Sequence, residues 1–332
     1  MIKVAVLALD SCPFSALALP VDIFNAAGVL YNRMAGIPED PRFMVRVISL
    51  SEQPVSCYKS VRIIPDCGLE GLEGNDIVII GAIADMSGIG HKYKDLNSKL
   101  VSLHDRGVTL ASICSGAFLL ASTGLLDGKG ATTHWGLCRQ FAELFPAVRV
   151  IASRTVVDQN LLLTSGGTTA GGDLALYLVR KYCGSRIAKQ CARVLLLDPY
   201  RSSQQPYNEL ILPMDHGDSE ISQVQEWVAA NYHREVTVAK LADVCSMSRR
   251  TFERRFKKAT GKSPLRYLQD VRLEKAKDLL EKGDYTFETI TNEVGYGDPS
   301  TFRRMFQKST GLPPGLYRQR FGMNTLPRPL LD

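Results

Sequence analysis

Residues 251–267 read TFERRFKKATGKSPLRY, and residues 301–317 repeat the pattern as TFRRMFQKSTGLPPGLY. From Phe252 and Phe302 onward, the aromatic, arginine, glycine and proline positions shared by the two stretches keep one constant offset. Each stretch places apolar residues at i and i+4 and arginines elsewhere, which predicts an amphipathic helix that ends at its Thr-Gly pair. The chain therefore uses one supersecondary unit twice.

A short helical run and a tight turn precede each copy. Before the first copy come a run at 238–244, a turn at 245–247 and Ser248, a residue type that caps the following helix. Before the second come a run at 290–294, a glycine-containing turn, and Asp298 followed by a proline suited to the first helical position. Both predict helix, turn and helix, the arrangement in which the second helix enters the major groove of DNA.

The net positive charge lies on the same part of the chain. The protein carries 40 Lys+Arg against 34 Asp+Glu. Residues 1–218 hold 20 basic and 20 acidic side chains, whereas residues 219–322 hold 19 and 13. Within 249–262, seven cations accompany a single acid, Glu253. That density suits the neutralisation of DNA phosphates, although an ordinary solvated helix surface is also rich in Lys and Arg.

With these motifs, residues 219–321 resemble the DNA-binding domain of the AraC/XylS family of bacterial transcription regulators, in which a long helix joins two helix-turn-helix units. Here the joining helix would be 264–282. The resemblance implies double-stranded promoter DNA and RNA polymerase as partners. It also places the base-reading side chains at Arg250, Glu253, Arg254, Ser300, Thr301 and Arg304, with Arg249, Thr251 and Arg303 as further DNA contacts. Arginine suits guanine, because its fork pairs with O6 and N7 together.

The aromatic residues of the repeat and one turn residue have other expected roles. We expect the apolar face of each recognition helix to pack inward, so the core should contain Phe252, Phe256, Phe302 and Phe306. Ser246 departs from the family pattern, which usually has glycine at this turn position. The departure concerns only the local geometry of the first turn.

Length and composition bound the rest of the protein. A chain of 332 residues is too long for this domain alone, so about two domains are expected. No run of about 18 apolar residues occurs, which predicts no membrane span. The eight cysteines are scattered, without a Cys-x-x-Cys pair or zinc-ligand spacing. We therefore expect a reduced, cytoplasmic protein without metal or cofactor.

The first part of the chain alternates strand and helix patterns. Short Val- and Ile-rich runs show little polar alternation, as buried parallel strands do, at 2–9, 43–50, 76–80 and 109–113. Helical patterns such as 93–106 separate these runs. The order predicts a doubly wound, flavodoxin-like α/β sheet followed by an all-α domain with two helix-turn-helix units.

Domain boundaries follow from a change in composition. Residues 198–218 are polar and contain proline, which is typical of a linker. We therefore expect an N-terminal domain at 1–197, a linker at 198–218, the DNA-binding domain at 219–321 and a tail at 322–332.

One N-terminal segment, ASICSGAFLLASTGLLDGKGATTHW at 111–135, carries the residues suited to chemistry. A buried strand runs into Cys114 and a helix begins at once. Such an elbow holds the side chain at the edge of the sheet, beside a helix N-terminus that lowers the pKa of a thiol. His134 follows 20 residues later. A cysteine and a histidine that converge in space would act as nucleophile and base.

The segment resembles the ThiJ/PfpI superfamily, whose fold is that of class I glutamine amidotransferases. The match comprises Cys114 at the elbow, the GLLDG turn at 124–128, the Ala-Thr-Thr-His stretch ending at His134, and Ser-Gly-Gly at 165–167. Joined to an AraC-type C-terminus, the whole chain resembles a GlxA-type regulator. That resemblance implies an N-terminal domain that senses a small nitrogenous metabolite, amino-acid-like or quaternary ammonium, and forms a homodimer.

Two departures from the superfamily favour a binding pocket over an active site. Its hydrolases place a histidine directly after the elbow cysteine, where this chain has Ser115, and other members keep an acid at the position of Ala16. Because a nucleophile needs an oriented base within hydrogen-bond reach, we expect no enzyme activity. The alternative is a cysteine-dependent hydrolase or amidase tethered to DNA, with Cys114 and His134 as its catalytic pair.

The expected ligand pocket gathers six residues around the elbow, namely Cys114, Ser115, His134, Trp135, Gly81 and Gly166. An aromatic face binds a cationic ligand, and glycine amides that follow strands hold a carboxylate. Each residue type also has an ordinary structural role, as a small buried hydrophobe, a satisfied histidine, a packed aromatic ring or a turn glycine. These alternatives stay open from the sequence alone.

Overall fold

Short runs of valine, isoleucine and alanine build the sheet of the N-terminal unit in the computed structural model, which describes residues 1–323 except 60, 200, 210–215 and 284. The chain divides into two units, Met1–Gln205 and Pro206–Asp332. Part of the expected linker and most of the expected tail lie outside the described residues.

Six strands form the main sheet in the order β2-β1-β5-β6-β10-β9, and all neighbours are parallel except β10 and β9. The five parallel strands follow the order second, first, third, fourth, fifth along the chain, which is that of flavodoxin. The predicted doubly wound sheet is therefore confirmed. The strands are β1 (Ile2–Leu7), β2 (Phe43–Ile48), β5 (Ile77–Ile80), β6 (Thr109–Ile113), β9 (Val156–Gln159) and β10 (Leu162–Ser165). Two small sheets pair β3 (Val55–Ser56) with β4 (Arg62–Ile63) and β7 (Gly130–Ala131) with β8 (Arg149–Val150).

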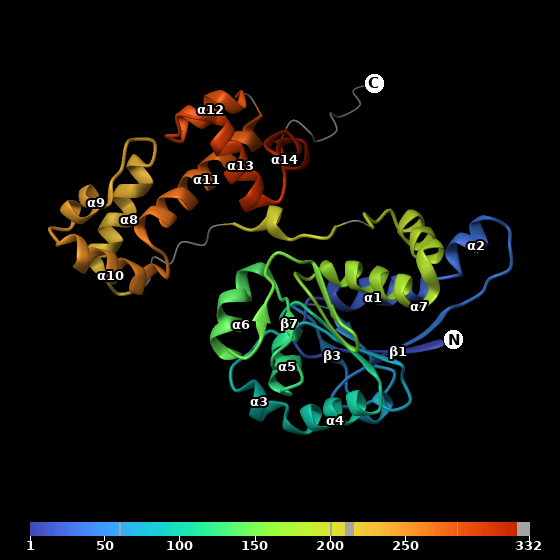
Figure 1. The fold of residues 1–332 in the computed structure, drawn as a ribbon. Coiled ribbons are helices and arrows are strands. Elements are labelled where there is room, and N and C mark those ends of the chain that lie inside the picture. Colours follow the sequence, from blue (N-terminus) through green and yellow to red (C-terminus); the bar gives the residue numbers. More distant parts are fainter. Residues whose placement is uncertain (60, 200, 210–215, 284, 324–332) are drawn as a thin grey trace. The chain divides into compact units, whose positions relative to one another are not determined.

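Helices cover both faces of this sheet. Alternate residues of β1 point to opposite faces, so Val4 and Val6 join one core cluster while Ala5 and Leu7 join the other. Figure 1 shows α1 and α7 on one side of the sheet and α4 on the other. The helices are α1 (Ser15–Ala26), α2 (Leu30–Met34), α3 (Ile89–Lys92), α4 (Lys94–Asp105), α5 (Gly116–Ser122), α6 (Cys138–Leu144) and α7 (Ala170–Val194), with 3-10 turns η1 (Leu69–Leu72), η2 (Trp135–Leu137) and η3 (Gln205–Tyr207). A left-handed Gly184 interrupts α7.

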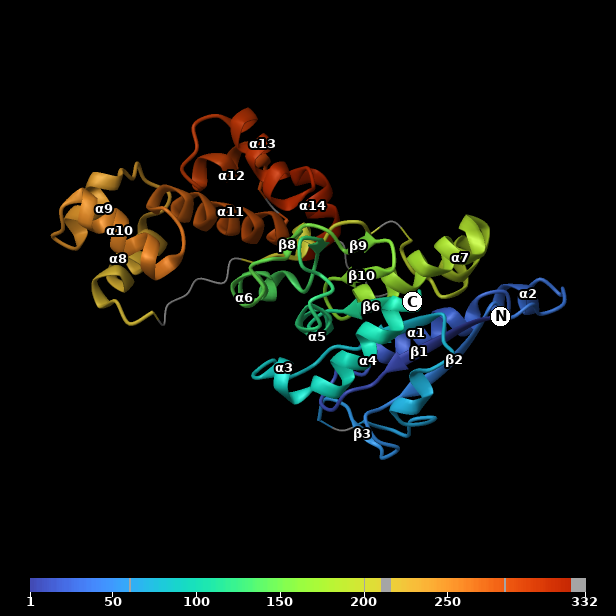
Figure 2. The same cartoon turned by 60° about the horizontal axis from the view of Figure 1, so that its bottom comes forward.

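The C-terminal unit is built from helices around two apolar clusters. Both views show α8, α9 and α10 at one end of α11 and α12, α13 and α14 at its other end (Figures 1 and 2). The first half of α11 contributes Leu268 and Val271 to one cluster, and its second half contributes Leu273 and Leu280 to the other. The helices are α8 (Ser219–Asn231), α9 (Val238–Val244), α10 (Arg249–Thr260), α11 (Pro264–Lys282), α12 (Phe287–Glu293), α13 (Pro299–Thr310) and α14 (Pro314–Phe321).

Local capping explains most of these helix ends. The Ser248 hydroxyl accepts a hydrogen bond from the Thr251 amide at 3.4 Å, and Asp298 accepts hydrogen bonds from the first amides of α13, so both predicted N-caps are confirmed. The prediction of 290–294 for the second short helix is wrong. That helix begins at Phe287, because the Thr286 hydroxyl accepts a hydrogen bond from the Thr289 amide at 3.1 Å and caps it earlier.

The two turns between helices reverse the chain with the same backbone conformation but with different residues. Ser246 has a left-handed backbone with φ +52°, and Gly295 plays the corresponding role in the second unit with φ +79°. A residue with a Cβ is strained in this region, whereas glycine is not. The first turn is therefore made with a serine in a conformation that suits glycine.

The repeated phenylalanines form equivalent cores, as predicted. Phe252, Phe256, Phe302 and Phe306 are all fully buried. Phe256 meets the ring of Tyr267 edge-on at 5.2 Å, and Phe306 meets Tyr317 edge-on at 5.4 Å. The sequence repeat is thus also a repeat of tertiary contacts.

Both ends of the expected linker make defined contacts. The Ser202 carbonyl accepts a hydrogen bond from the Thr155 amide at 3.2 Å, and the Gln204 amide donates to the Ser153 carbonyl at 3.0 Å. Pro206 begins the second unit, where it is buried. Backbone hydrogen bonds therefore hold residues 202–204 of the expected linker on the N-terminal domain.

No helix in the described ranges combines the length and apolar character that a membrane crossing needs. Among those same residues, no cluster of three or more His, Cys, Asp or Glu side chains is arranged to hold a metal ion.

Candidate nucleic-acid interface and ligand pocket

The first recognition helix presents two arginines from its opening turns. Arg250 and Arg254 are both exposed and lie four residues apart, so they share one face of α10. Thr251 between them is half-buried and its amide is engaged by the Ser248 cap. This face is exposed at the position where the sequence predicts base-reading residues.

Three of the seven cations expected to neutralise phosphates have protein partners instead. Arg249 pairs with Glu253 at 3.1 Å. Arg255 bridges Asp218 at 2.7 Å and Glu220 at 2.9 Å, and its guanidinium holds the pKa of Asp218 below its usual range. Lys262 pairs with Asp270 at 2.7 Å. In the described part of the chain, the members of the basic stretch that are exposed and form no ion pair are Arg250, Arg254, Lys257 and Lys258.

The second recognition helix repeats the arrangement with fewer charges. Ser300, Thr301 and Arg304 are exposed in its first turns, and Arg304 donates a hydrogen bond to the Thr301 hydroxyl at 3.3 Å. The guanidinium of Arg303 lies 5.2 Å from the centre of the Phe287 ring. Arg303 therefore also packs against the preceding helix, α12, by a cation–π contact.

In the N-terminal unit, the strand β6 turns into α5 at Cys114, as expected. Cys114 has a left-handed backbone with φ +55°, the strained conformation of a nucleophile elbow, and its side chain is buried. The turn is this tight because Gly116 has no Cβ. A Cβ there would lie 2.5 Å from the carbonyl oxygen of Gly81.

The thiol at the elbow is not activated. Burial raises the pKa of Cys114 above its ordinary value, outweighing the lowering by its hydrogen bonds with Ser115 and Thr168. The expected lowering by the helix N-terminus is therefore overturned, because loss of hydration dominates. Burial also lowers the pKa of His134, so its ring is neutral at pH 7.

His134 comes to the elbow without bonding the thiol. The hydroxyl of the preceding Thr133 donates to the Cys114 carbonyl at 2.8 Å, which fixes this stretch against the elbow. The His134 Nδ1 accepts a hydrogen bond from the Gly136 amide at 3.1 Å, so a neutral ring carries its proton on Nε2. Among the described residues, no hydrogen bond joins His134 to Cys114.

Several expected ligand donors are already used by the protein. The Ser115 hydroxyl donates to the Ile83 carbonyl at 2.6 Å and accepts from the Ile83 amide at 2.9 Å. The Gly81 amide donates to the Leu7 carbonyl, and the Gly166 amide donates to the Thr155 carbonyl. The Ser115 hydroxyl and the two glycine amides therefore already have protein partners, and direct ligand contacts from these three residues stay a prediction.

Gln204 is a buried residue beside the elbow that no sequence pattern predicted. Its Oε1 accepts from the Trp135 amide at 3.1 Å, and its Nε2 donates to the Thr133 carbonyl at 2.9 Å. A Cβ on Gly166 would lie 2.7 Å from the same Oε1. Gln204 stands in the polar stretch SSQQP, which has no pattern that separates it from an ordinary linker.

With this geometry in place, residues 3–181, more than half of the chain, match the model of the DJ-1/PfpI family. The chain belongs to the DJ-1/PfpI family. Residues 241–320 match a helix-turn-helix domain model. The protein thus joins a DJ-1/PfpI domain to an AraC-type helix-turn-helix domain, and the resemblances inferred from the sequence are confirmed.

Two similar proteins match this chain along most of their length. The chain is 25% identical over 322 residues, 96% of this chain and 84% of the other, to the HTH-type transcriptional regulator GbdR of Pseudomonas aeruginosa. It is 29% identical over 270 residues, 81% and 79% of the two chains, to the HTH-type transcriptional regulator CdhR of the same species. The crystal structure of an AraC family transcriptional regulator from Pseudomonas putida has a TM-score of 0.51 at 19% identity and covers 59% of this chain and 100% of that chain, which shows the shared fold.

The state of the DJ-1/PfpI thiol leads to a pH prediction. Because burial raises the pKa of Cys114, its thiolate fraction at neutral pH is below that of an ordinary cysteine. We follow the rate of Cys114 alkylation by iodoacetamide as the pH is raised. We expect the midpoint of this rise to lie at a higher pH in the folded chain than in the same chain unfolded in urea. Peptide-resolved mass spectrometry separates Cys114 from the other cysteines. Hindered access lowers the rate at every pH without moving the midpoint, so a folded midpoint below the unfolded one would contradict a protonated thiol.

Proposed function

We propose that this protein is a cytoplasmic, ligand-responsive transcription regulator that binds promoter DNA as a homodimer and acts on RNA polymerase. The observation that carries the proposal is the pair of recognition helices. Their first two turns expose arginines, Arg250 and Arg254 on α10 and Arg304 on α13. Such side chains read base edges from the major groove. The relatives GbdR and CdhR are named transcriptional regulators, which supports the same class.

In this proposal the DJ-1/PfpI domain binds its ligand without covalent chemistry. The raised pKa of Cys114 and the engagement of the His134 ring by Gly136 support a binding role. A hydrolase would need His134 as an oriented base within hydrogen-bond reach of the thiol. The elbow then serves as the rigid wall of a pocket.

We propose an effector of the amino-acid-like or quaternary ammonium class. The rings of His134 and Trp135 lie 5.1 Å apart at the elbow, and both are partly exposed. Aromatic faces attract a nitrogen cation, most strongly when the cation is desolvated. Because a ligand shifts only an equilibrium whose two states it binds differently, the effector must prefer one arrangement of the DNA-binding domains.

A thermal-shift screen of the full chain tests the sensing role with glycine betaine, carnitine, arginine and spermidine as probes. Saturable binding to the folded state raises the melting temperature by mass action. We expect a hit that Trp135→Ala weakens and Cys114→Ser retains. The ligand should be recovered unchanged when followed by NMR.

Three other outcomes contradict parts of this proposal. Consumption of the ligand that needs Cys114 would establish the hydrolase instead. A hit that Trp135→Ala leaves unchanged would place the ligand away from the elbow. If none of these chemical classes raises the melting temperature, the proposal of a nitrogenous effector is contradicted.

A further inference from the structure

Residues 201–209, which we call the connector, are anchored on both sides of the boundary between the two units. On the N-terminal side, Arg201 binds Asp173 through Nε at 2.8 Å and Nη2 at 2.5 Å. Ser203 pairs with Arg154 in an antiparallel bridge. The first half of the connector is thus held by an ion pair and by backbone hydrogen bonds.

The Gln204 side chain connects the first half of the connector to residues beside the elbow. It is only 5% exposed and binds the Trp135 amide and the Thr133 carbonyl. Thr133 in turn donates its hydroxyl to the Cys114 carbonyl. Thr133 therefore links Gln204 to Cys114 at the elbow. Gln204 also holds the backbone of Trp135, which we propose to bind the effector.

The second half of the connector is anchored on the DNA-binding domain. Tyr207 meets the Phe321 ring edge-on at 5.5 Å, and its hydroxyl accepts a hydrogen bond from Arg320 at 2.6 Å. Lys277 of α11 is 5% exposed and donates to the Asn208 carbonyl at 2.6 Å. Holding a buried ammonium group requires such partners, so the connector backbone contributes to keeping Lys277 in place.

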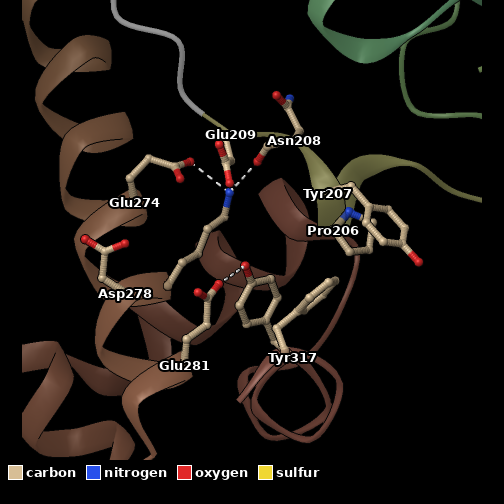
Figure 3. A pocket seen from close by; sticks show the side chains of 10 residues that line it. Pro206, Tyr207, Asn208, Glu209, Glu274, Asp278, Glu281 and Tyr317 are labelled. Carbon is tan, nitrogen blue, oxygen red and sulfur yellow. Dashed lines mark hydrogen bonds and ion pairs between the residues drawn. The ribbon is translucent and has the colours of Figure 1, made fainter. Parts of the chain in front are cut away.

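Acidic side chains surround this second anchor. Lys277 donates hydrogen bonds to Glu274 at 2.8 Å and to the Asn208 carbonyl at 2.6 Å. Figure 3 shows Glu274, Asp278 and Glu281 around this anchor, where they line a cavity of about 470 Å³. Burial raises the pKa of Glu274, and the nearby Lys277 lowers it. Release of the connector would therefore leave a buried ion pair with one fewer polar contact, which makes the docked and released states energetically distinct.

Aromatic contacts continue from this anchor to the second recognition helix. Phe321 lies 4.7 Å from Tyr317, and Tyr317 lies 5.4 Å from Phe306 of α13, measured between ring centres. Packed side chains of this kind pass small displacements on, because dense interiors do not absorb them. The docked connector thus touches the packing that supports α13.

We propose that the connector transmits effector occupancy from the elbow pocket to the second helix-turn-helix unit, through Gln204 at one anchor and Tyr207 and Asn208 at the other. The proposal rests on the proposed function, because it assigns a route to that regulation. The turn η3 joins the anchors directly along the chain, since Gln204 and Tyr207 are separated only by Gln205 and Pro206. A ligand that moves Trp135 changes the hydrogen bonds of Gln204, and by linkage a change at Tyr207 acts back on the pocket.

Amide hydrogen exchange of the full chain, without DNA or effector, tests this coupling. Gln204→Ala removes the anchor at the pocket, and Tyr207→Ala removes the anchor on α14. Since communicating sites are commonly coupled by about fivefold or more, we expect Gln204→Ala to speed exchange in α14 about fivefold. We expect Tyr207→Ala to speed exchange at residues 132–135 by the same factor.

An insertion separates transmission along the connector from general loosening. Four residues, Gly-Gly-Ser-Gly, placed between Gln205 and Pro206 keep both sets of anchors and break the link between them. In this background Gln204→Ala should still speed exchange at 132–135, while exchange in α14 should equal that of the insertion alone. The same insertion after Glu209 is the matched control, and it should leave the remote effect of Gln204→Ala intact.

Local loosening at 132–135 without any change in α14 would overturn the proposal, and so would a remote effect that survives insertion at Pro206. If Gln204→Ala does not fold, Tyr207→Ala puts the same question from the other anchor. The measurement uses neither effector nor operator. An effector screen without a hit would therefore contradict the sensing function. Hydrogen exchange without coupling would contradict only the role of the connector.

Discussion

Arg254→Ala and Arg304→Ala are each expected to weaken specific DNA binding by about 1–3 kcal/mol, the usual loss for one base-reading arginine. Both side chains are exposed in the opening turns of their helices. Neither takes part in an ion pair in the part of the chain that the structure describes. Among the described residues, Arg254 forms no hydrogen bond or ion pair, whereas Arg304 donates to the Thr301 hydroxyl and interacts electrostatically with Asp298. The loss should therefore appear in DNA binding, with little change in thermal stability.

Fluorescence anisotropy measures this loss on two duplexes at several salt concentrations. One duplex is selected from a random pool by the wild-type protein, and the other is its scrambled sequence. Lys258→Ala is the matched control, since it removes one exposed charge from the last turn of α10. Loss of a phosphate contact weakens binding to both duplexes alike and reduces the salt slope by about one. Equal losses on both duplexes for Arg254→Ala would therefore contradict base reading.

Arg255 shows why the basic stretch could be only partly interpreted from its sequence. The pattern of seven cations predicts phosphate neutralisation, and nothing in the pattern separates Arg255 from Arg254. The structure pairs Arg255 with Asp218, which lies far earlier in the chain and caps α8. Spacing along a helix shows which residues share a face, whereas partners from another helix depend on packing that the local pattern does not contain.

Local signals, in contrast, located the starts of both recognition helices. Ser248 and Asp298 cap their helices as predicted, because capping involves residues within three positions of each other. Gln204 is the opposite case, since its partners Thr133 and Trp135 lie about 70 residues away. The sequence therefore predicted the elbow and its histidine, but missed the residue that ties them to the following segment.

For Cys114 the expected geometry is present, but the expected lowering of the thiol pKa is wrong. The strand-to-helix elbow is present, with the left-handed backbone that such a turn requires. A helix N-terminus lowers the pKa of a thiol that stays hydrated. Here burial dominates and raises the pKa of Cys114. The extent of burial comes from how the surrounding loops pack, which the motif alone does not define.

The two recognition helices must also be held at a defined spacing, and Arg272 of α11 is the residue placed to do so. Its Nε donates to the Tyr232 carbonyl and its Nη2 to the Arg234 carbonyl, each at 2.8 Å, in the loop between α8 and α9. Its guanidinium also lies 5.2 Å from the ring centre of Tyr296, in the turn of the second unit. Arg272 thereby joins the loop of one helix-turn-helix unit to the turn of the other.

Arg272→Met is expected to lower operator affinity at least about tenfold, because each hydrogen bond from a charged group stabilises by about 1.5–3 kcal/mol. Two linked units bind with an effective concentration set by their geometry, and a loosened joint lowers it. Arg272→Lys should lower operator affinity nearly as much, since a lysine has no planar fork to reach both carbonyls. Lys275→Met is the control on the same helix, because the Lys275 ammonium pairs with Asp278, a residue of α11 itself.

Anisotropy on the full operator and on each half-site separates loss of alignment from loss of fold. If Arg272 aligns the units, Arg272→Met weakens the full operator while each half-site is bound as tightly as by the wild-type protein. Equal weakening on the halves would mean that the recognition helices themselves have unfolded. Wild-type affinity for the full operator would show that α11 alone holds the spacing, as a rigid helix shared by both apolar clusters.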